Sequence, residues 1–451
     1  MMRSVGKFVL AIMVLGIVAV GALYAWAESA TATPSIATPE RLRSDPATIE
    51  RGRYLVTTGD CVACHTMPRG QPFAGGLALD SPVGQIYSSN ISPDRETGIG
   101  DYTLDDFDRV MRYGIAKRGD SIYPAMPFPS YAHMTADDIA AMYAYLMHDV
   151  KPVHSANHDT KIRWPLSARW PLSIWRRLYA PDPAVVASDG HRYPDPQIAR
   201  GAYLVQGPGH CGSCHTERAV TLQEKALDDS SPSYLAGGTV IDGWVSVNLR
   251  GNTADGLGGW SKDDIVSSLR TGRNPAHAVI GTAMSDVVYH STQYMTDDDL
   301  TAMAAYLKSL PPTAGDDVTY VADGRTAAEL KAGINSTRGA ELYTDSCAAC
   351  HATDGLGKQP ALPAIAGNSS ALSPNPTSII RLVLAGSELP SVAKAPSPLG
   401  MPAFGWRFSD AEAAQLLTFV RTSWGNHAPV VTASQVAKVR ASLKADDVPQ
   451  Q

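Results

Sequence analysis

Three stretches of the chain begin with a polar helix cap and continue as a run rich in apolar residues. Each starts with serine or threonine followed by acidic residues, which suits the first turn of a helix, where the helix dipole favours negative charge. The runs end at Val150, at Leu310 before two prolines, and at Trp424 before a glycine. The pattern predicts closing helices over residues 135–150, 296–310 and 409–424.

A second pattern recurs ahead of each closing helix. The phrase Arg-Gly-Arg-Tyr-Leu-Val at residues 51–56 returns as Arg-Gly-Ala-Tyr-Leu-Val at 200–205, and more loosely as Arg-Gly-Ala-Glu-Leu-Tyr at 338–343. Internal repetition of this kind indicates a duplicated structural unit. Each phrase predicts a short opening helix, the first over residues 49–58. We expect the aromatic residue at the fourth position to pack against the closing helix of its own unit.

The N-terminus has a different pattern, because Arg3 and Lys7 precede an unbroken apolar run over residues 8–27. Ala25-Trp26-Ala27 fits the small-x-small cleavage site of a secretory signal, and a run of this length is also about enough to span a bilayer. The sequence favours a cleaved signal over a retained anchor for residues 1–27, because the small residues stand where the run ends. Either interpretation predicts that the remainder lies at the periplasmic face of the bacterial cytoplasmic membrane.

The candidate chemistry comes from cysteine. All six cysteines belong to three Cys-x-x-Cys-His motifs, at residues 61–65, 211–215 and 347–351. This is the attachment pattern for a c-type haem, in which each thiol adds to a vinyl group of the porphyrin and the adjacent histidine binds the iron. A zinc half-site would need a second ligand pair, and a thioredoxin-like redox pair does not need the histidine. The sequence therefore predicts three covalently bound haem c groups, attached to Cys61, Cys64, Cys211, Cys214, Cys347 and Cys350.

Length and motif spacing agree on the organisation. The motifs start 150 and 136 residues apart, and a chain of 451 residues suggests about three domains. We predict an all-α fold of three tandem class I cytochrome c-like haem domains joined by irregular linkers. The expected domains are residues 48–150, 198–311 and 337–425, with linkers at 151–197 and 312–336 and a tail at 426–451 that carries a short surface helix. The formal charge of −6 gives no indication of nucleic-acid binding.

A haem iron bound by one histidine has a second axial position, which methionine usually fills in electron-transferring cytochromes c. With His65, His215 and His351 as the first ligands, the third domain offers a single methionine, Met401. In the second domain Met284 lies in a predicted loop, and it is preferred to four other residues: Met295, Met303, His277 and His290.

The first domain offers six methionines, and Met126 is the candidate that remains. Met67 is too close to His65 to reach the opposite face of a haem, and the others fall in predicted helical segments: Met111, Met134, Met142 and Met147. Irons with histidine and methionine on both faces leave no position for a substrate. The chain is therefore expected to relay electrons and to carry no catalytic residue of its own.

Three residues are candidates for supporting contacts. Pro363 could offer its carbonyl oxygen to the ring N–H of His351 and so fix its tautomer. Asn90 and Asn248 occupy matching places in the first two domains, each followed by Gly-x-Gly and an aromatic residue. They would hydrogen-bond a haem propionate or make a simple turn, and the sequence leaves both alternatives open.

The first linker contains three tryptophans interleaved with three arginines over residues 164–178. We call this segment the Trp/Arg strip. Such a composition is typical of a partner-docking or membrane-interface surface. The alternative, which we favour, is that the rings cover the seam between the first and second domains.

Several phrases are more specific than haem attachment requires, at residues 59–66, 123–127, 170–175, 207–211, 223–228 and 291–294. On these phrases the chain, over residues 48–430, resembles the tri-haem cytochrome c subunit of bacterial membrane-bound dehydrogenases. That family serves quinoprotein alcohol dehydrogenase and the flavin-dependent gluconate, fructose and sorbitol dehydrogenases. The phrases at 170–175 and 223–228 are most similar to the alcohol dehydrogenase subunit.

The resemblance implies that the chain takes electrons from a quinoprotein or flavoprotein subunit, passes them to ubiquinone, and tethers that subunit to the membrane surface. The chain departs from the family in lacking an evident long amphipathic helix in its tail, so the N-terminal segment or the Trp/Arg strip is expected to provide the tether. Two alternatives are a freestanding multihaem carrier that serves a terminal oxidase, and an enzyme such as a peroxidase, which needs one open iron.

Overall fold

The computed structural model describes residues 2–29, 33–186, 192–274, 277–281, 283–313, 319–358, 362–397 and 399–444. The chain forms two compact units, Met1–His191 and Arg192–Gln451. Parts of the predicted linkers, residues 187–191 and 314–318, and the end of the predicted tail, residues 445–451, lie outside the described residues.

The first unit is mainly helical, with one small antiparallel sheet in the order β1-β2-β3. Its helices are α1 (Met2–Glu28), α2 (Pro46–Thr58), α3 (Cys61–Cys64), α4 (Leu104–Tyr113), α5 (Phe128–Tyr131), α6 (Ala136–His148), α7 (Trp170–Tyr179) and α8 (Pro183–Val186). Its strands are β1 (Ala78–Ser81), β2 (Gly84–Tyr87) and β3 (Lys161–Ile162).

The second unit is also mainly helical, and its described residues add three two-stranded ladders. Its longer helices are α9 (Pro196–Gln206), α11 (Lys262–Thr271), α12 (Ala283–His290), α13 (Asp297–Ser309), α15 (Arg338–Ser346), α18 (Thr377–Ala385), α19 (Asp410–Thr422) and α20 (Ala433–Ser442). The shorter ones are α10 (Gly212–His215), η2 (Thr292–Tyr294), α14 (Arg325–Lys331), α16 (Ala348–His351) and α17 (Ser369–Leu372). The paired strands are β4 (Val240–Ile241) with β5 (Trp244–Val245), β6 (Arg273–Asn274) with β7 (Ala278–Val279), and β8 (Ser387–Glu388) with β9 (Gly400–Met401).

The three predicted closing helices are present as α6, α13 and α19. Each begins as its sequence predicts, because the side chain of Thr135, Thr296 or Ser409 accepts a hydrogen bond from the backbone N–H three residues on. The predicted opening helices are present as α2, α9 and α15. The fold is thus mostly α, as predicted, and the short strands are the part that the sequence pattern did not indicate.

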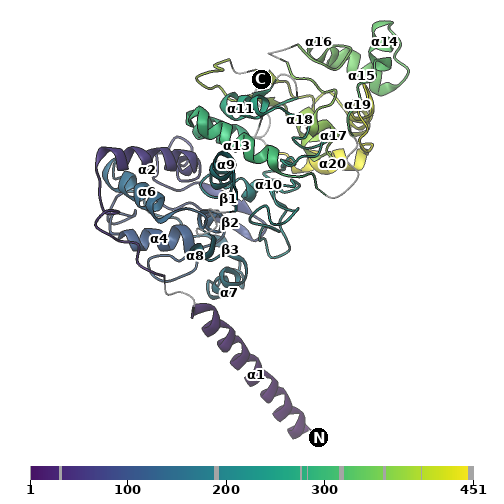
Figure 1. The fold of residues 1–451 in the computed structure, drawn as a ribbon. Helices are drawn as coiled ribbons and strands as arrows, with labels where there is room; N and C mark the ends of the chain where they lie inside the picture. The colour runs from purple at the N-terminus through teal and green to yellow at the C-terminus, as the bar shows by residue number, and fades with distance from the viewer. Residues whose placement is uncertain are drawn as a thin grey trace. The chain divides into compact units, whose positions relative to one another are not determined.

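Each opening helix lies against its closing helix: α2 on α6, α9 on α13 and α15 on α19 (Figure 1). The glycine of the repeated phrase marks the crossing. A Cβ added to Gly52, Gly201 or Gly339 would lie under 3.0 Å from a backbone carbonyl oxygen of the closing helix. The two backbones therefore approach as closely as only glycine permits.

The arginine before that glycine also contacts the closing helix. It forms an ion pair with the acidic residue three positions after the N-cap, and the pairs are Arg51–Asp138 at 2.6 Å, Arg200–Asp299 at 2.8 Å and Arg338–Glu412 at 2.8 Å. The repeated Arg-Gly phrase is therefore the docking element of the opening helix.

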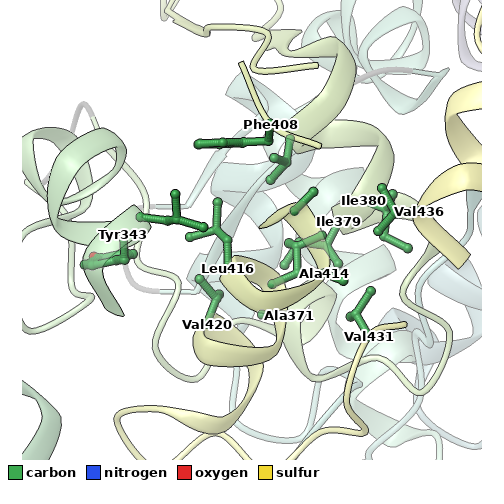
Figure 2. Packing of buried hydrophobic residues seen from close by; sticks show 14 of the residues in the cluster. Tyr343, Ala371, Ile379, Ile380, Phe408, Ala414, Leu416, Val420, Val431 and Val436 are labelled. Carbon is green, nitrogen blue, oxygen red and sulfur yellow. The ribbon is translucent and has the colours of Figure 1, made fainter. Parts of the chain in front are cut away.

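Three large clusters of buried apolar side chains form most of the interior of the described residues, one around each pair of crossing helices, and a small fourth cluster joins Val288, Val392 and Ala395. Figure 2 shows the cluster around α15 and α19. Tyr343 from α15 and Leu416 from α19 belong to it together with Ile379 and Ile380 from α18. The tail helix α20 contributes Val436 to this cluster, so the helix predicted at the surface of the tail has one buried face.

The N-terminal helix α1 is continuous (Figure 1), and its residues Lys7–Glu28 are long and apolar enough to cross a membrane, with a mean hydropathy of 2.6. The predicted cleavage site lies within this helix. The C-terminal end of α1 packs against α7: the rings of Tyr24 and Trp170 meet edge-on at 6.5 Å, and Arg177 lies over the ring of Trp26 at 5.4 Å.

The Trp/Arg strip includes nearly all of α7, and one side of the strip packs within the first unit. Arg176 is buried and its Nε donates to the hydroxyl of Ser121, while the ring of Trp175 meets that of Phe128 edge-on at 6.1 Å. The other side exposes Trp164, Leu166, Trp170 and Leu178. The strip therefore has a buried face on the first unit and an exposed apolar face.

Candidate haem sites

The three Cys-x-x-Cys-His motifs occupy equivalent local structures. Each follows directly on an opening helix and is itself a single helical turn, formed by α3, α10 or α16. A tight bend joins the two helices in the first two motifs, where Asp60 and His210 have positive φ values. After the bend, the two cysteines and the histidine of the motif lie on a single helical turn.

A backbone carbonyl oxygen fixes the ring of each motif histidine. The pairs, with the distance from ring Nδ1 to carbonyl oxygen, are His65–Ser89 at 2.7 Å, His215–Val247 at 2.8 Å and His351–Pro363 at 3.1 Å. Because a carbonyl oxygen can only accept, Nδ1 carries the hydrogen and the neutral ring keeps its lone pair on Nε2. This is the tautomer that an iron ligand needs, held in one orientation.

The contact between His351 and Pro363 confirms the prediction made from the sequence. For the first two motifs the sequence named no histidine partner: Asn90 and Asn248 were expected to contact a propionate or to make a turn. The carbonyl oxygens that accept from these rings belong to the residues just before the two asparagines. Asn90 Nδ2 donates to the carbonyl oxygen of Val153 at 2.8 Å, and Asn248 Oδ1 accepts from the backbone N–H of Arg250 at 2.9 Å. Both asparagines brace the loops that present the histidine contacts, which favours the turn role over a propionate contact.

Burial lowers the pKa of His65, His215 and His351, although each carbonyl contact opposes this effect. The rings are therefore neutral near pH 7. A neutral imidazole can bind a metal ion, whereas an imidazolium cannot.

The first cysteine of each motif packs against the apolar cluster of its own region. These are Cys61, Cys211 and Cys347, and burial raises the pKa of each thiol to about 12. Cys64 and Cys350 are exposed. A catalytic dithiol needs a lowered pKa, so these pairs are unlike a thioredoxin-type redox centre. Among the described residues, no group of three or more His, Cys, Asp or Glu side chains is placed to hold a metal ion.

Each candidate methionine packs against the same apolar cluster as the first cysteine of its motif. Met126 shares a cluster with Cys61, Met284 with Cys211, and Met401 with Cys347. Each of the three methionines is partly buried. Met284 differs from expectation in one respect, because it lies in the first turn of α12 rather than in a loop.

The rival residues have other roles in the structure. The ring of His277 stacks on Trp260 at 5.1 Å, and its Nε2 lies 3.5 Å from a carboxylate oxygen of Asp264. The ring of His290 meets that of Tyr289. Five of the rejected methionines are buried within the apolar clusters: Met111, Met134, Met142, Met295 and Met303.

The surroundings of the motifs fit a bound group that is both apolar and polar. Beside the apolar clusters lie buried polar atoms that have no hydrogen-bond partner in the described part of the chain, including Ser346 Oγ next to Cys347, Ser285 Oγ next to Met284, and Tyr234 Oη near the second motif. Unpaired buried polar atoms are rare in folded proteins and are expected where a bound group completes the site. The donor set of two thiols, a neutral imidazole and a nearby thioether is that of haem c.

Comparison with known proteins agrees with this chemistry. The Cytochrome c family pattern matches three segments, residues 49–149, 198–311 and 336–424. The chain is 52% identical to the gluconate 2-dehydrogenase cytochrome c subunit of Pantoea cypripedii, over 88% of this chain and 90% of that protein. It is 48% identical to the cytochrome c subunit of the quinone alcohol dehydrogenase of Gluconobacter oxydans (strain 621H), over 88% and 83% respectively.

A more distant relative is the fructose dehydrogenase cytochrome subunit of Gluconobacter japonicus, at 36% identity over 88% of this chain and 83% of that protein. High identity across nearly the whole length of such relatives excludes a match confined to one motif. The chain therefore belongs to the cytochrome c family and, within it, to the cytochrome c subunits of gluconate and quinone-linked alcohol dehydrogenases, and it binds haem c covalently.

Proposed function

We propose that the chain is a tri-haem subunit that relays electrons from a catalytic dehydrogenase subunit to ubiquinone at the membrane. The observation that carries the proposal is the threefold recurrence of a Cys-x-x-Cys-His motif whose histidine ring is fixed by a backbone carbonyl. Haem c, when bound, supplies a one-electron Fe(III)/Fe(II) couple whose potential depends on its axial ligands and surroundings.

Three tandem haem domains, residues 48–150, 198–311 and 337–425, are supported by three large apolar clusters and three matched family segments. In this proposal the two cysteines of each motif anchor the macrocycle. The Nδ1–H contact of each histidine orients its ring and keeps the ligand lone pair on Nε2. The apolar cluster of each domain excludes water from the site.

The proposed second axial ligands are Met126, Met284 and Met401, with His65, His215 and His351 on the opposite faces. Support comes from the packing of each methionine against the cluster that also holds the first cysteine of its motif. With both axial positions filled, no iron would accept a substrate. The chain would then carry electrons only, and oxidation of the substrate would take place on the partner.

A catalytic partner follows from the relatives, which are named as subunits of gluconate and alcohol dehydrogenases. The partner is proposed to carry either pyrroloquinoline quinone or a flavin. Ubiquinone as the acceptor is proposed on the same basis, since the alcohol dehydrogenase relatives are named quinone enzymes.

Tethering at the periplasmic face of the cytoplasmic membrane is supported by the N-terminal part of the first unit. The apolar helix α1 has the length of a membrane span and packs on α7 at its C-terminal end. The exposed face of the Trp/Arg strip includes Trp164, which is 84% exposed, together with Leu166, Trp170 and Leu178. Tryptophan and arginine beside the end of a span are typical of the membrane–water interface.

Affinity purification from detergent-solubilised membranes tests the proposal. We expect a large dehydrogenase subunit to co-purify, together with ubiquinone reductase activity driven by an alcohol or by gluconate. A variant with all six motif cysteines replaced by serine should lose that activity. Recovery of the protein alone from the soluble fraction would contradict the proposal and would favour a freestanding carrier.

A further inference from the structure

The segment after the second motif folds back onto the motif. The backbone N–H of Ala219 donates to the carbonyl oxygen of Gln223, and that of Lys225 donates to the carbonyl oxygen of Glu217, both at 2.9 Å. These bonds form a small hairpin that places Glu224 against the two residues between the motif cysteines, Gly212 and Ser213.

Glu224 is buried there with one carboxylate oxygen unsatisfied. Its side chain is only 5% exposed, and its Oε1 accepts a hydrogen bond from the hydroxyl of Ser213 at 3.2 Å. Its Oε2 is buried without a hydrogen-bond partner among the described residues. A Cβ added to Gly212 would lie 2.8 Å from this Oε2, so the carboxylate lies directly against the motif backbone.

Few charges face Glu224. The guanidinium of Arg218 lies 4.0 Å from Oε1, but it donates to the carbonyl oxygens of Ser213 and Leu222. The ring of Tyr234 also lies against Gly212, and burial raises the pKa of that phenol, so it stays neutral.

The remaining ionisable groups nearby do not compensate Glu224. Lys225 is paired with Glu217 at 2.6 Å in an exposed ion pair, and the His215 ring is neutral. Burial raises the pKa of Glu224 to about 7, although Arg218 and the Ser213 hydroxyl oppose this effect. The carboxyl group is therefore close to the midpoint of its titration at physiological pH.

We propose that Glu224 binds a proton when the iron held by His215 is reduced and releases it when that iron is oxidised. This inference rests on the proposed function, because it requires haem at the second motif. Reduction adds one electron from the donor and removes one positive charge from the site, which weakens the attraction that favours the carboxylate. Glu224 then takes one proton from solvent, so that one electron and one proton enter together.

Coupling of this kind makes the reduction potential of one haem fall as pH rises, because reduction then consumes a proton. A potentiometric titration of the purified full-length holoprotein at several pH values measures this pH dependence of the reduction potential. We expect one of the three potentials to fall by at most about 59 mV per pH unit, which is the equivalent of a tenfold change for a one-electron couple. The Glu224→Gln variant, which preserves shape but cannot ionise, should lose this dependence.

Two further variants keep the test decisive. Glu217→Gln removes an exposed carboxylate of the same hairpin and should leave the pH dependence unchanged. Ser213→Ala removes the hydrogen bond that lowers the pKa of Glu224, so the pH-dependent region should move to higher pH. It also provides a result if Glu224→Gln does not assemble.

The inference is overturned if no potential depends on pH in the wild-type protein, or if the dependence persists in Glu224→Gln. A haem count on the same samples distinguishes a failure of the role of Glu224 from a failure of the proposed function. Three haems with an unchanged pH dependence in Glu224→Gln would overturn the role of Glu224 alone, whereas fewer than three haems in the wild type would overturn the proposed function.

Discussion

Gly201 faces the carbonyl oxygen of Ala302 so closely that a Cβ at this glycine would lie under 3.0 Å from it. This is the point at which α9 crosses α13. The same relationship joins Gly52 to Ala141 and Gly339 to Gln415. The glycine of the repeated phrase thus sets the crossing of the two helices that frame each proposed haem domain.

Replacing this glycine should destabilise the second domain. For Gly201→Ala we expect a loss of about 3 kcal/mol in the free energy of unfolding, at the upper end of overpacking effects, because the clash is with backbone rather than with a flexible side chain. Denaturant unfolding of the holoprotein measures it. Gly259→Ala is the control, since a Cβ there would have no heavy atom within 4 Å. Equal midpoints for the two variants would contradict this interpretation of the crossing.

The proposed methionine ligands can be tested one at a time. Replacing Met126, Met284 or Met401 by leucine should open one iron and allow it to bind carbon monoxide, because leucine has no donor atom. The spectrum of the reduced protein should then shift by the contribution of one haem. Met303→Leu, which changes a buried methionine of the second cluster, is the matched control and should not respond. Absence of a shift in Met284→Leu would assign that ligand to a histidine.

Arg421 in α19 ties the segment around Ala371 and Ser373 to the start of the tail at Pro429. It is 0% exposed, and its guanidinium donates to the carbonyl oxygens of Ala371, Ser373 and Pro429. Arg421→Met would leave these carbonyl oxygens without their donors, which costs roughly 1–3 kcal/mol for each buried group. We therefore expect a loss of at least about 3 kcal/mol in unfolding free energy. Arg325→Met, at a side chain 78% exposed, should change stability little, and a similar effect of both variants would refute this role.

The ion pair between Arg338 and Glu412 should give the third domain a pH-dependent stability. Hydrogen bonds from Arg338 and Ser409 lower the pKa of Glu412 to about 2. Because the folded-state pKa lies below the ordinary value of 4.5, the stabilisation is complete above that value and is lost as the pH falls through about 2.

The difference in stability between the wild type and Arg338→Met should accordingly be larger near neutral pH than near pH 2. Thermal unfolding across this pH range measures the difference. In a Glu412→Gln background, which cannot titrate at this position, the effect of Arg338→Met should vary less with pH, and what remains comes from Glu341, which Arg338 also contacts at 3.0 Å. The same pH dependence in the wild-type and Glu412→Gln backgrounds would exclude Glu412 as its source.

The elements framing each domain could be predicted because their signals are local. A threonine or serine cap with acidic residues predicted α6, α13 and α19, and those helices begin where the caps stand. The repeated Arg-Gly phrase revealed the opening helices, but not that its glycine and arginine both contact the closing helix. That information was available in the sequence, since an invariant glycine within a repeated helix indicates close backbone approach.

The histidine contacts show where sequence reasoning stops. Pro363 is only twelve residues from His351 and was identified correctly, whereas the partners of His65 and His215 lie 24 and 32 residues away in loops. For those two rings the sequence named no partner, because every residue has a backbone carbonyl and none is marked by its side chain. The two-residue strands and the helical position of Met284 likewise depend on tertiary contacts.

The most direct test of the account is the effect of carbon monoxide on the spectrum of the fully reduced wild-type protein, recorded on a sample whose haem content is known. The account predicts three haems per chain and no shift, because both faces of every iron are occupied. A large shift would reveal an open iron and would contradict the view that this chain only carries electrons for a separate catalytic subunit.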